Sequence, residues 1–353
     1  TSYTGGTFSK APETITLPTE TAGTYYLHVL TIDNVGNKKE VISSKVIINQ
    51  KDPTKDWDLS KVDKIESADG IPVPVPKGYV ASSVASENTV KDGFVIYEGE
   101  EAVTDTNVSE AQTTRNQFVW VPVADIADYK RIAYTGDSLS ECTEDLPSDE
   151  KTSVTTYKGF YIGRYEAGDK ENTANKTYRS SNDTTETVTI KANQVPYNYV
   201  RREDAISLAS GFGTKQGYKA KTKLVSSYAW DVTIDFIQKV NSDYGKSSEE
   251  GNYNNTTFSY IDINGARQTK ASGSKVLVPT GQTTPVCNIY DMGGNVWEWT
   301  SENSDGSFIV FTNPYEKRGG DRDASYTGYT AGYRYPNANS AELGIGFRIT
   351  LFM

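Results

Sequence analysis

The chain has 353 residues, enough for two or three domains, and its 36% hydrophobic and 11% aromatic residues can build a packed core. Its formal net charge is −10, and an acidic chain without a basic cluster is disfavoured as a nucleic-acid binder because it repels phosphate backbones. No apolar run approaches the roughly 20 residues that a bilayer-spanning helix needs, so we expect no membrane insertion within this chain.

Histidine and cysteine are scarce. The single histidine, His28, excludes metal sites built on several imidazoles. It lies in an alternating run typical of a strand, which favours a structural role. The two cysteines, Cys142 and Cys287, are too few for a disulfide framework, and the sequence leaves open whether they pair with each other.

The first 50 residues carry the pattern of strands. We expect a short strand at 14–17, a long one at 23–32 and another at 40–48, with turn residues at 33–37. This region, 1–50, resembles the last strands of bacterial Ig-like repeats. A sandwich of that kind needs about seven strands, so we expect only part of one here.

A charged segment, 51–68, has little apolar pattern and is expected to be a linker. The alternating prolines and valines that follow favour an extended edge segment rather than a central strand. Further strands are expected at 93–97, 117–123 and 157–168, and polar loops at 100–114 and 135–153.

Two segments have helical patterns. Residues 200–209 have helical spacing with acidic residues near their start, and 223–245 carry apolar residues at positions such as Trp230, Ile234 and Ile237. Gly245 is expected to end the second helix. Helix is otherwise scarce, so the overall class is expected to be α+β.

Three motifs occur in order near the C-terminus. They are Gly-Asn-Val-Trp-Glu-Trp at 294–299, Arg-Gly-Gly at 318–320 and Gly-Phe-Arg at 346–348. Together they resemble the formylglycine-generating-enzyme-like (sulfatase-modifying factor) superfamily, over roughly residues 117–353. The resemblance implies a C-type lectin-like domain over 69–353 with few helices and much irregular loop, preceded by the partial Ig-like β-sandwich segment.

The motif residues also have a physical interpretation of their own. Gly293 and Gly294 permit positive φ in a tight turn. Trp297 and Trp299 lie two residues apart and share one strand face, where they are expected to fill core. Arg348 is expected to pair with a buried carboxylate as a structural residue.

Lectin folds often bind calcium through carboxylate, amide and carbonyl oxygens. The resemblance places a structural calcium near Asp291, Asn295 and Glu298. The alternative is that these side chains cap loop amides. No cofactor is expected to be required.

The enzymes of this superfamily use two cysteines as copper-binding thiolates between the Gly-Gly and Gly-Phe-Arg motifs. Residues 321–345 contain no cysteine. Related sulfoxide synthases use several histidines on iron, and this chain has one. The sequence therefore predicts that the protein is not an enzyme, with a sulfatase-modifying-type oxidoreductase as the disfavoured alternative.

The same segment is rich in tyrosine, with serine, glycine, asparagine and arginine around it, which is the composition of a binding surface. In the C-type lectin fold this stretch lies on the exposed binding face. The alternative is a tyrosine-rich loop packed on itself. The predicted ligand-binding residues are Asp321, Arg322, Asp323, Ser325, Tyr326, Tyr329, Tyr333, Arg334, Tyr335, Asn337 and Asn339.

The order of Arg-Gly-Gly, Ala331-Gly332 and Ile345-Gly-Phe-Arg close to the C-terminus also resembles variable proteins of diversity-generating retroelements. The composition is typical of bacterial surface proteins. We therefore expect an extracellular, cell-surface or phage-particle protein, an adhesin or receptor-binding tip, that binds a protein or glycan ligand on another cell or host surface. A structural surface or pilus subunit is a further alternative.

Overall fold

The computed structural model describes most of the chain, in two compact units, Thr1–Lys55 and Asp56–Met353. The described residues are 23–26, 28–33, 35–42, 46–48, 52–134, 139–170, 178–217, 220–246, 249–304 and 314–353.

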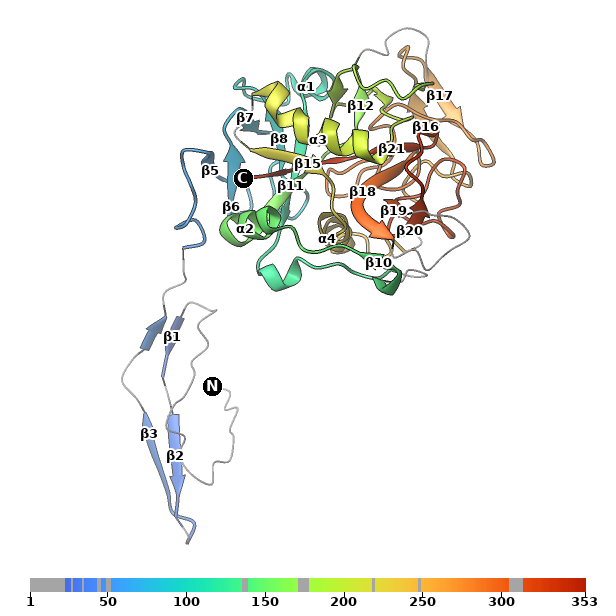
Figure 1. Cartoon of the computed structure of the whole chain (residues 1–353). Helices are drawn as coiled ribbons and strands as arrows, with labels where there is room; N and C mark the ends of the chain where they lie inside the picture. The colour runs from blue at the N-terminus through green and yellow to red at the C-terminus, as the bar shows by residue number, and fades with distance from the viewer. Residues whose placement is uncertain are drawn as a thin grey trace. The chain divides into compact units, whose positions relative to one another are not determined.

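The described part of the first unit consists of two antiparallel strand pairs (Figure 1). Strand β1 (Gly23–Tyr25) pairs with β4 (Val46–Ile48), and β2 (His28–Ile32) pairs with β3 (Lys38–Ile42). His28 lies 2.7 Å from a Glu40 carboxylate oxygen across the β2–β3 pair, in agreement with a structural role. The strand expected at 14–17 lies outside the described residues, and these pairs do not establish an Ig-like sandwich.

The segment expected to be a linker lies largely in the second unit. Trp57 and Val62 are buried there, and β5 (Val62–Glu66) pairs with β6 (Pro72–Pro76). The boundary between the units falls after Lys55. The Pro–Val alternation forms β6, whose partner is β5 alone, as expected for an edge segment.

A six-stranded antiparallel sheet is the centre of the second unit, in the order β15-β22-β11-β9-β8-β7. Alternating residues of β9 enter two different cores: Phe118 and Trp120 pack with residues of helix α3, whereas Val119 and Val121 pack with residues of helix α4. The sheet is therefore covered on both faces (Figure 1). The strands are β7 (Tyr79–Ala81), β8 (Val95–Glu98), β9 (Gln117–Pro122), β11 (Gly159–Gly163), β15 (Lys221–Leu224) and β22 (Ile349–Phe352).

Both expected helices form, with different bounds. α3 (Arg202–Gln216) extends beyond the expected range, and α4 (Ser227–Gln238) is shorter than expected because residues before it belong to β15. The Ser226 hydroxyl caps α4 by accepting the backbone N–H of Ala229 at 3.1 Å. Gly245 lies beyond the helix end, with φ of 84°, so the prediction that it terminates the helix is wrong.

Two predicted loops contain helices instead. α1 (Val108–Thr114) and α2 (Ser148–Tyr157) lie at the ends of the polar segments expected to be irregular. The sequence did not indicate α2 because its weakly apolar face is completed by tertiary contacts. Its buried Glu150 accepts hydrogen bonds from Tyr129 at 2.7 Å and Ser226 at 2.8 Å. None of the helices in the described ranges is long and apolar enough to cross a bilayer.

The second large sheet carries the C-terminal motifs. Its order is β10-β18-β19-β20, and β21 pairs in parallel with β18. The strands are β10 (Cys142–Thr143), β18 (Trp297–Ser304), β19 (Tyr315–Arg318), β20 (Arg334–Asn337) and β21 (Ile345–Phe347). The remaining elements are β12 (Gly168–Asp169), β13 (Val188–Thr189), β14 (Val195–Pro196), β16 (Phe258–Ile261), β17 (Arg267–Lys270), and the 3₁₀ turns η1 (Ile126–Asp128) and η2 (Leu139–Glu141).

The structural roles expected for several motif residues are confirmed. Trp297 and Trp299 are buried, and the Arg348 guanidinium makes two hydrogen bonds, at 2.8 and 2.9 Å, to the buried Glu298 carboxylate. Gly294 has φ of 72°, whereas Gly293 does not adopt a positive φ. The class is α+β, with four α-helices among the described residues and long irregular connections.

Candidate ligand-binding face

The sheet formed by β18, β19 and β20 has two chemically different faces. Glu298, Arg318 and Arg334 lie directly opposite one another on the three strands, so their side chains share one face. Lys317 lies directly opposite Tyr335, and these two side chains share the other face. Because side chains alternate along a strand, the neighbours Arg334 and Tyr335 have opposite roles. The first belongs to a buried ion network and the second to an exposed aromatic cluster.

The buried network joins this sheet to α4. Asp231 of α4 accepts from the Arg318 guanidinium at 2.6 Å and also pairs with Arg334. Arg334 further donates to Glu302 at 2.8 Å, and Arg131 reaches the same carboxylate at 3.0 Å. Asp231, Glu302 and Arg318 have fully buried side chains. The two carboxylates are paired with the surrounding arginines, as buried charges require.

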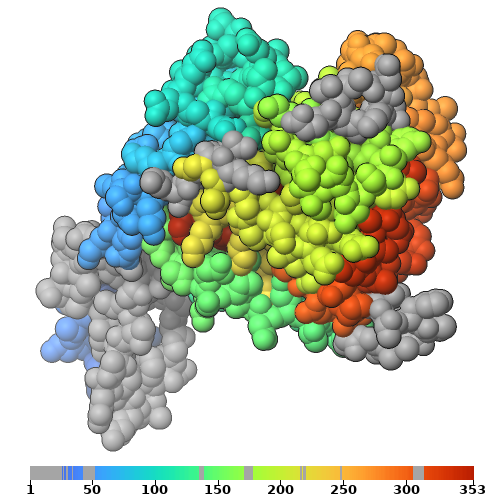
Figure 2. Space-filling model, turned by 45° about the horizontal axis from the view of Figure 1, so that its top comes forward, coloured from blue at the N-terminus to red at the C-terminus, as the bar shows by residue number. Residues whose placement is uncertain are grey.

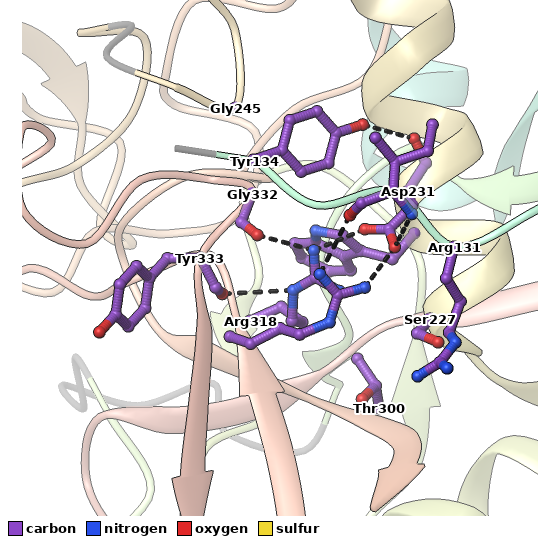
Figure 3. Close-up of polar contacts among 12 residues, drawn as sticks. Arg131, Tyr134, Ser227, Asp231, Gly245, Thr300, Arg318, Gly332 and Tyr333 are labelled. Carbon is purple, nitrogen blue, oxygen red and sulfur yellow. Dashed lines mark hydrogen bonds and ion pairs between the residues drawn. The ribbon is translucent and has the colours of Figure 1, made fainter. Parts of the chain in front are cut away.

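The network also fixes the backbone of the tyrosine-rich segment (Figure 3). Arg318 donates to the carbonyl oxygens of Gly332, at 2.7 Å, and Tyr333, at 3.2 Å. Trp230 of α4 donates from its indole nitrogen to the Ala331 carbonyl at 2.9 Å. The Gly245 carbonyl accepts the backbone N–H of Gly332 at 3.1 Å. In the close-up the Tyr333 ring points away from the network.

Four aromatic side chains form a cluster on the opposite face, which we call the tyrosine face: Trp297, Tyr329, Tyr333 and Tyr335. Trp297 lies beneath, with its ring centroid 5.6 Å from that of Tyr329 and 5.3 Å from that of Tyr335. Tyr329 contacts Tyr333 edge-on at 5.2 Å. Tyr329 and Tyr335 are 37% and 38% exposed, so mutual packing holds these rings while leaving part of each accessible.

Lys317 lies under this cluster. Its ammonium group is 5.1 Å from the ring centroids of both Trp297 and Tyr335, within cation–π range. Burial lowers the pKa of Lys317, an effect opposed by the charges of Glu342 and Asp321. The lysine therefore adds a positive charge close to an otherwise aromatic surface.

A hollow of about 190 Å³ lies near the same part of the sheet, lined by Tyr178, Lys275, Val276, Leu277, Arg322 and Leu343. The Arg322 backbone N–H donates to the Asn295 carbonyl at 3.2 Å, and the Trp297 N–H donates to the Gly344 carbonyl at 2.8 Å. Both contacts attach the hollow's walls to the start of β18. Figure 2 shows this C-terminal, orange-red part of the chain at the surface beside the yellow-green region of α3.

The predicted contact residues do not form one surface. Tyr326 packs on Tyr253, with centroids 6.2 Å apart, outside the tyrosine face. Arg334 is a buried network residue, so its prediction as a contact is wrong. The Asn339 side chain accepts the backbone N–H of Arg202 at 2.9 Å, at the first residue of α3, which is a structural use of its amide.

Several of the predicted polar contact residues form hydrogen bonds with groups nearby in the sequence. Asp321 accepts the backbone N–H groups of Asp323, at 3.0 Å, and Ala324, at 3.1 Å, and burial raises its pKa. Ser325 bonds the Thr327 hydroxyl at 2.9 Å. The Asn337 side-chain amide donates to a Glu342 carboxylate oxygen at 3.4 Å. Asp323 is exposed, and Arg322 is 7% exposed.

The residues suggested for calcium all have protein partners. The Asp291 carboxylate accepts from the Gly281 N–H at 2.7 Å and from the Thr283 hydroxyl at 3.0 Å. Glu298 is paired with Arg348, and the Asn295 oxygen accepts from the Val278 N–H at 3.0 Å. Within the described ranges, no group of three or more His, Cys, Asp or Glu side chains is placed to hold a metal ion. The alternative of capped loop amides agrees with these contacts.

Cys142 and Cys287 do not form a disulfide with each other, and both side chains are buried. Burial raises the pKa of Cys287 to about 12. Nucleophilic and metal-binding cysteines require the opposite shift, toward the thiolate.

Sequence reasoning missed two contributors to this region. Trp297 was predicted to fill core rather than to form part of a ligand platform, and Lys317 was not singled out, although it alternates with Arg318 along β19. Strand alternation next to the Arg-Gly-Gly motif was the signal that could have placed Lys317 with the tyrosines. Lys275 lies far from the segment in sequence, and no local pattern indicates it.

No protein-family model matches the chain, and no curated protein matches it. Solved structures that resemble it include the following three. One is CarF, with 15% identity and a TM-score of 0.38, covering 56% of this chain and 87% of CarF. PvdO from Pseudomonas aeruginosa has 18% identity and a TM-score of 0.40, covering 68% and 95% of the two chains. Treponema denticola variable protein 1 has 15% identity and a TM-score of 0.39, covering 67% and 96%.

The three neighbours are similar to this chain at 15–18% identity only. Since all three TM-scores are below 0.5, the likeness carries no conclusion about what this chain binds or catalyses.

Proposed function

We propose that the protein is an extracellular ligand-binding protein, an adhesin or receptor-binding tip, that contacts its ligand through the tyrosine face. One observation carries this proposal. Tyr335 on β20 and Tyr329 in the turn before it remain more than one-third exposed although both pack on Trp297. Rigid, amphipathic aromatic rings give large contact area at low entropic cost, and residues of this kind dominate binding energy at interfaces.

The partner proposed is a protein or glycan on another cell or host surface. The first unit would serve as a stalk of Ig-like type, and the protein would be displayed at a bacterial surface or on a phage particle. Residues 321–345 would be diversified by a retroelement. The coding DNA tests this last point directly: a near-identical template repeat beside a reverse transcriptase gene supports it, and the absence of both overturns it.

Backbone anchoring supports such diversification physically. The contacts from Arg318 and Trp230 end on main-chain carbonyls of residues 331–333. Such contacts persist whatever side chain a neighbouring outward position carries. The segment can therefore change its surface chemistry while keeping its path.

The alternative of a sulfatase-modifying-type oxidoreductase is less well supported by the chemistry of the chain. Residues 321–345 contain no cysteine, and the Cys287 thiol is shifted away from the thiolate that copper would need. A structural surface or pilus subunit remains the alternative that the binding experiment addresses.

The experiment is a screen of glycan and surface-protein arrays with the full chain. Wild type is compared with the double variant Tyr329→Ala/Tyr335→Ala, and with Tyr26→Ala, which removes a tyrosine 52% exposed on the first unit. We expect the double variant to lose at least tenfold in affinity while keeping its circular dichroism spectrum, and Tyr26→Ala to bind as wild type.

Equal binding by wild type and the folded double variant would refute the tyrosine face as the binding site. No binding by any of the three proteins would favour the structural subunit instead, to be checked by its self-assembly.

A further inference from the structure

The hollow beside the tyrosine face contains a cation with unused hydrogen-bonding capacity. Arg322 is 7% exposed, and its Nη1 atom meets no hydrogen-bond acceptor among the residues that the structure describes. Its nearest carboxylate, that of Asp323, is 3.9 Å from Nη2. This distance exceeds that of a hydrogen bond. A buried guanidinium N–H group without an acceptor is unfavourable unless another group supplies one.

The surroundings of Arg322 favour a ligand with a single negative charge. The ammonium group of Lys275, exposed at the rim, lies 4.0 Å from an Asp323 carboxylate oxygen, and the Asp321 carboxylate lies close enough to Arg322 for their charges to interact. The charges of Arg322 and Lys275 are thus matched by those of Asp321 and Asp323, and Lys317 also interacts with Asp321. A monovalent carboxylate adds one charge to this balance, whereas a phosphate dianion adds up to two, and the planar guanidinium matches carboxylate geometry.

The remaining walls of the hollow define the rest of the ligand group. Val276, Leu277 and Leu343 supply apolar surface, and Tyr178, which is 45% exposed, supplies an aromatic ring at the edge. With a volume of about 190 Å³, the hollow has room for one small organic acid and not for a folded segment.

We propose that this hollow is a subsite for a carboxylate group of the ligand, with Arg322 as the residue that binds it and Lys275 as a supporting charge at the rim. The inference rests on the proposed binding function, since it gives the chemistry of one ligand group taken next to the tyrosine face. Both regions attach to the start of β18, through Trp297 and Asn295. A single ligand that spans the two would gain contacts from each.

The test is a ligand-observed NMR titration of the full chain with four probes: glucuronate, N-acetylglutamate α-amide, neutral glucose and inorganic sulfate. We expect wild type to bind at least one of the two carboxylates and to bind neither glucose nor sulfate with comparable affinity. Glucuronate as the tighter probe assigns the group to an acidic sugar, and N-acetylglutamate α-amide as the tighter probe assigns it to an acidic side chain.

The variants are chosen so that a loss of binding can be distinguished from a loss of folding. Arg322→Gln removes the charge and is expected to weaken carboxylate binding about ten- to a hundredfold, the range for a charge-assisted hydrogen bond. Lys275→Gln changes an exposed residue, so it carries little folding risk, and is expected to weaken binding about two- to fivefold. The matched control is Arg267→Gln, an exposed arginine on β17 that does not line this hollow; it should bind as wild type.

Unchanged carboxylate binding by folded Arg322→Gln and by Lys275→Gln would overturn the proposal, as would sulfate binding with the same affinity and the same dependence on Arg322. The double variant Tyr329→Ala/Tyr335→Ala separates the two proposals. We expect it to retain the small carboxylate while losing the array ligand. If the array ligand is unaffected by that variant but the carboxylate still requires Arg322, the tyrosine face fails and the carboxylate subsite stands.

Discussion

Replacing Arg318 with methionine tests whether the buried ion network stabilises the second unit and fixes the tyrosine segment. The Arg318 side chain is fully buried, and it donates to Asp231 at 2.6 Å and to the Gly332 carbonyl at 2.7 Å. Methionine keeps much of the apolar stem but removes the charge and all donors. Asp231 then loses one of its two arginine partners, and the carbonyls of Gly332 and Tyr333 lose a buried donor.

Removing one member of a buried ion pair lowers the free energy of unfolding by about 3–5 kcal/mol. For a unit of this size the melting temperature changes by about 2 °C per kcal/mol, so we expect a fall of about 6–10 °C. We also expect weaker ligand binding, because the path of the segment bearing Tyr333 is no longer fixed.

The assay is urea unfolding followed by tryptophan fluorescence. All five tryptophans lie in the second unit, so the signal reports that unit alone. Arg267→Met, at an exposed position on β17, is the matched control and should stay within about 0.5 kcal/mol of wild type. A loss below about 1 kcal/mol for Arg318→Met would refute the reasoning that the network is a main source of stability here.

Three further predictions concern single groups. Gly320→Ala should lower the free energy of unfolding by about 1–3 kcal/mol more than Gly265→Ala, measured in urea, because both glycines have positive φ but only at Gly320 would a Cβ lie 2.4 Å from the Tyr329 carbonyl; equal losses would contradict the steric argument. Burial, with a smaller contribution from neighbouring negative charge, raises the pKa of Glu316 from 4.5 to about 8. Wild type should therefore lose stability relative to Glu316→Gln as pH rises from about 4.5 to 8, by up to a few kcal/mol, and parallel urea-stability profiles of the two proteins would refute this. Burial raises the pKa of Cys287 to about 12, so iodoacetamide at pH 8 should modify it in urea but not in the native protein, as read by mass spectrometry, and rapid native labelling would contradict the buried position.

The parts of the fold that could be predicted are those determined by local pattern. Strand 117–123 became β9 because its apolar residues favour a strand buried on both faces. α4 could be found from its apolar spacing, but its start could not. Residues 223 and 224 belong to β15, where pairing with β22 overrides their helical surroundings. α2 was missed because its buried residues include Glu150, whose polar partners come from distant segments.

The candidate site was predictable in composition but not in orientation. The sequence indicated that the tyrosines and arginines near the C-terminus belong together. It could not show that Arg334 turns inward to Glu302 while Tyr335 turns outward, because this depends on which face of β20 is covered by α4. Alternation along a strand gives two faces, and only tertiary packing decides which of them is buried.

This inward–outward division explains how a buried charge network and the tyrosine face can coexist in one short segment. Arg334 binds Asp231 and Glu302 with its side chain, so its identity matters for folding. The neighbouring path is held through main-chain carbonyls, which every residue type offers. Tyr329 and Tyr335 contribute to the surface by their side chains alone. Substitutions at these two positions therefore change what the face can bind at little cost in stability, whereas substitution of Arg334 leaves buried carboxylates without a partner and is costly whatever the ligand.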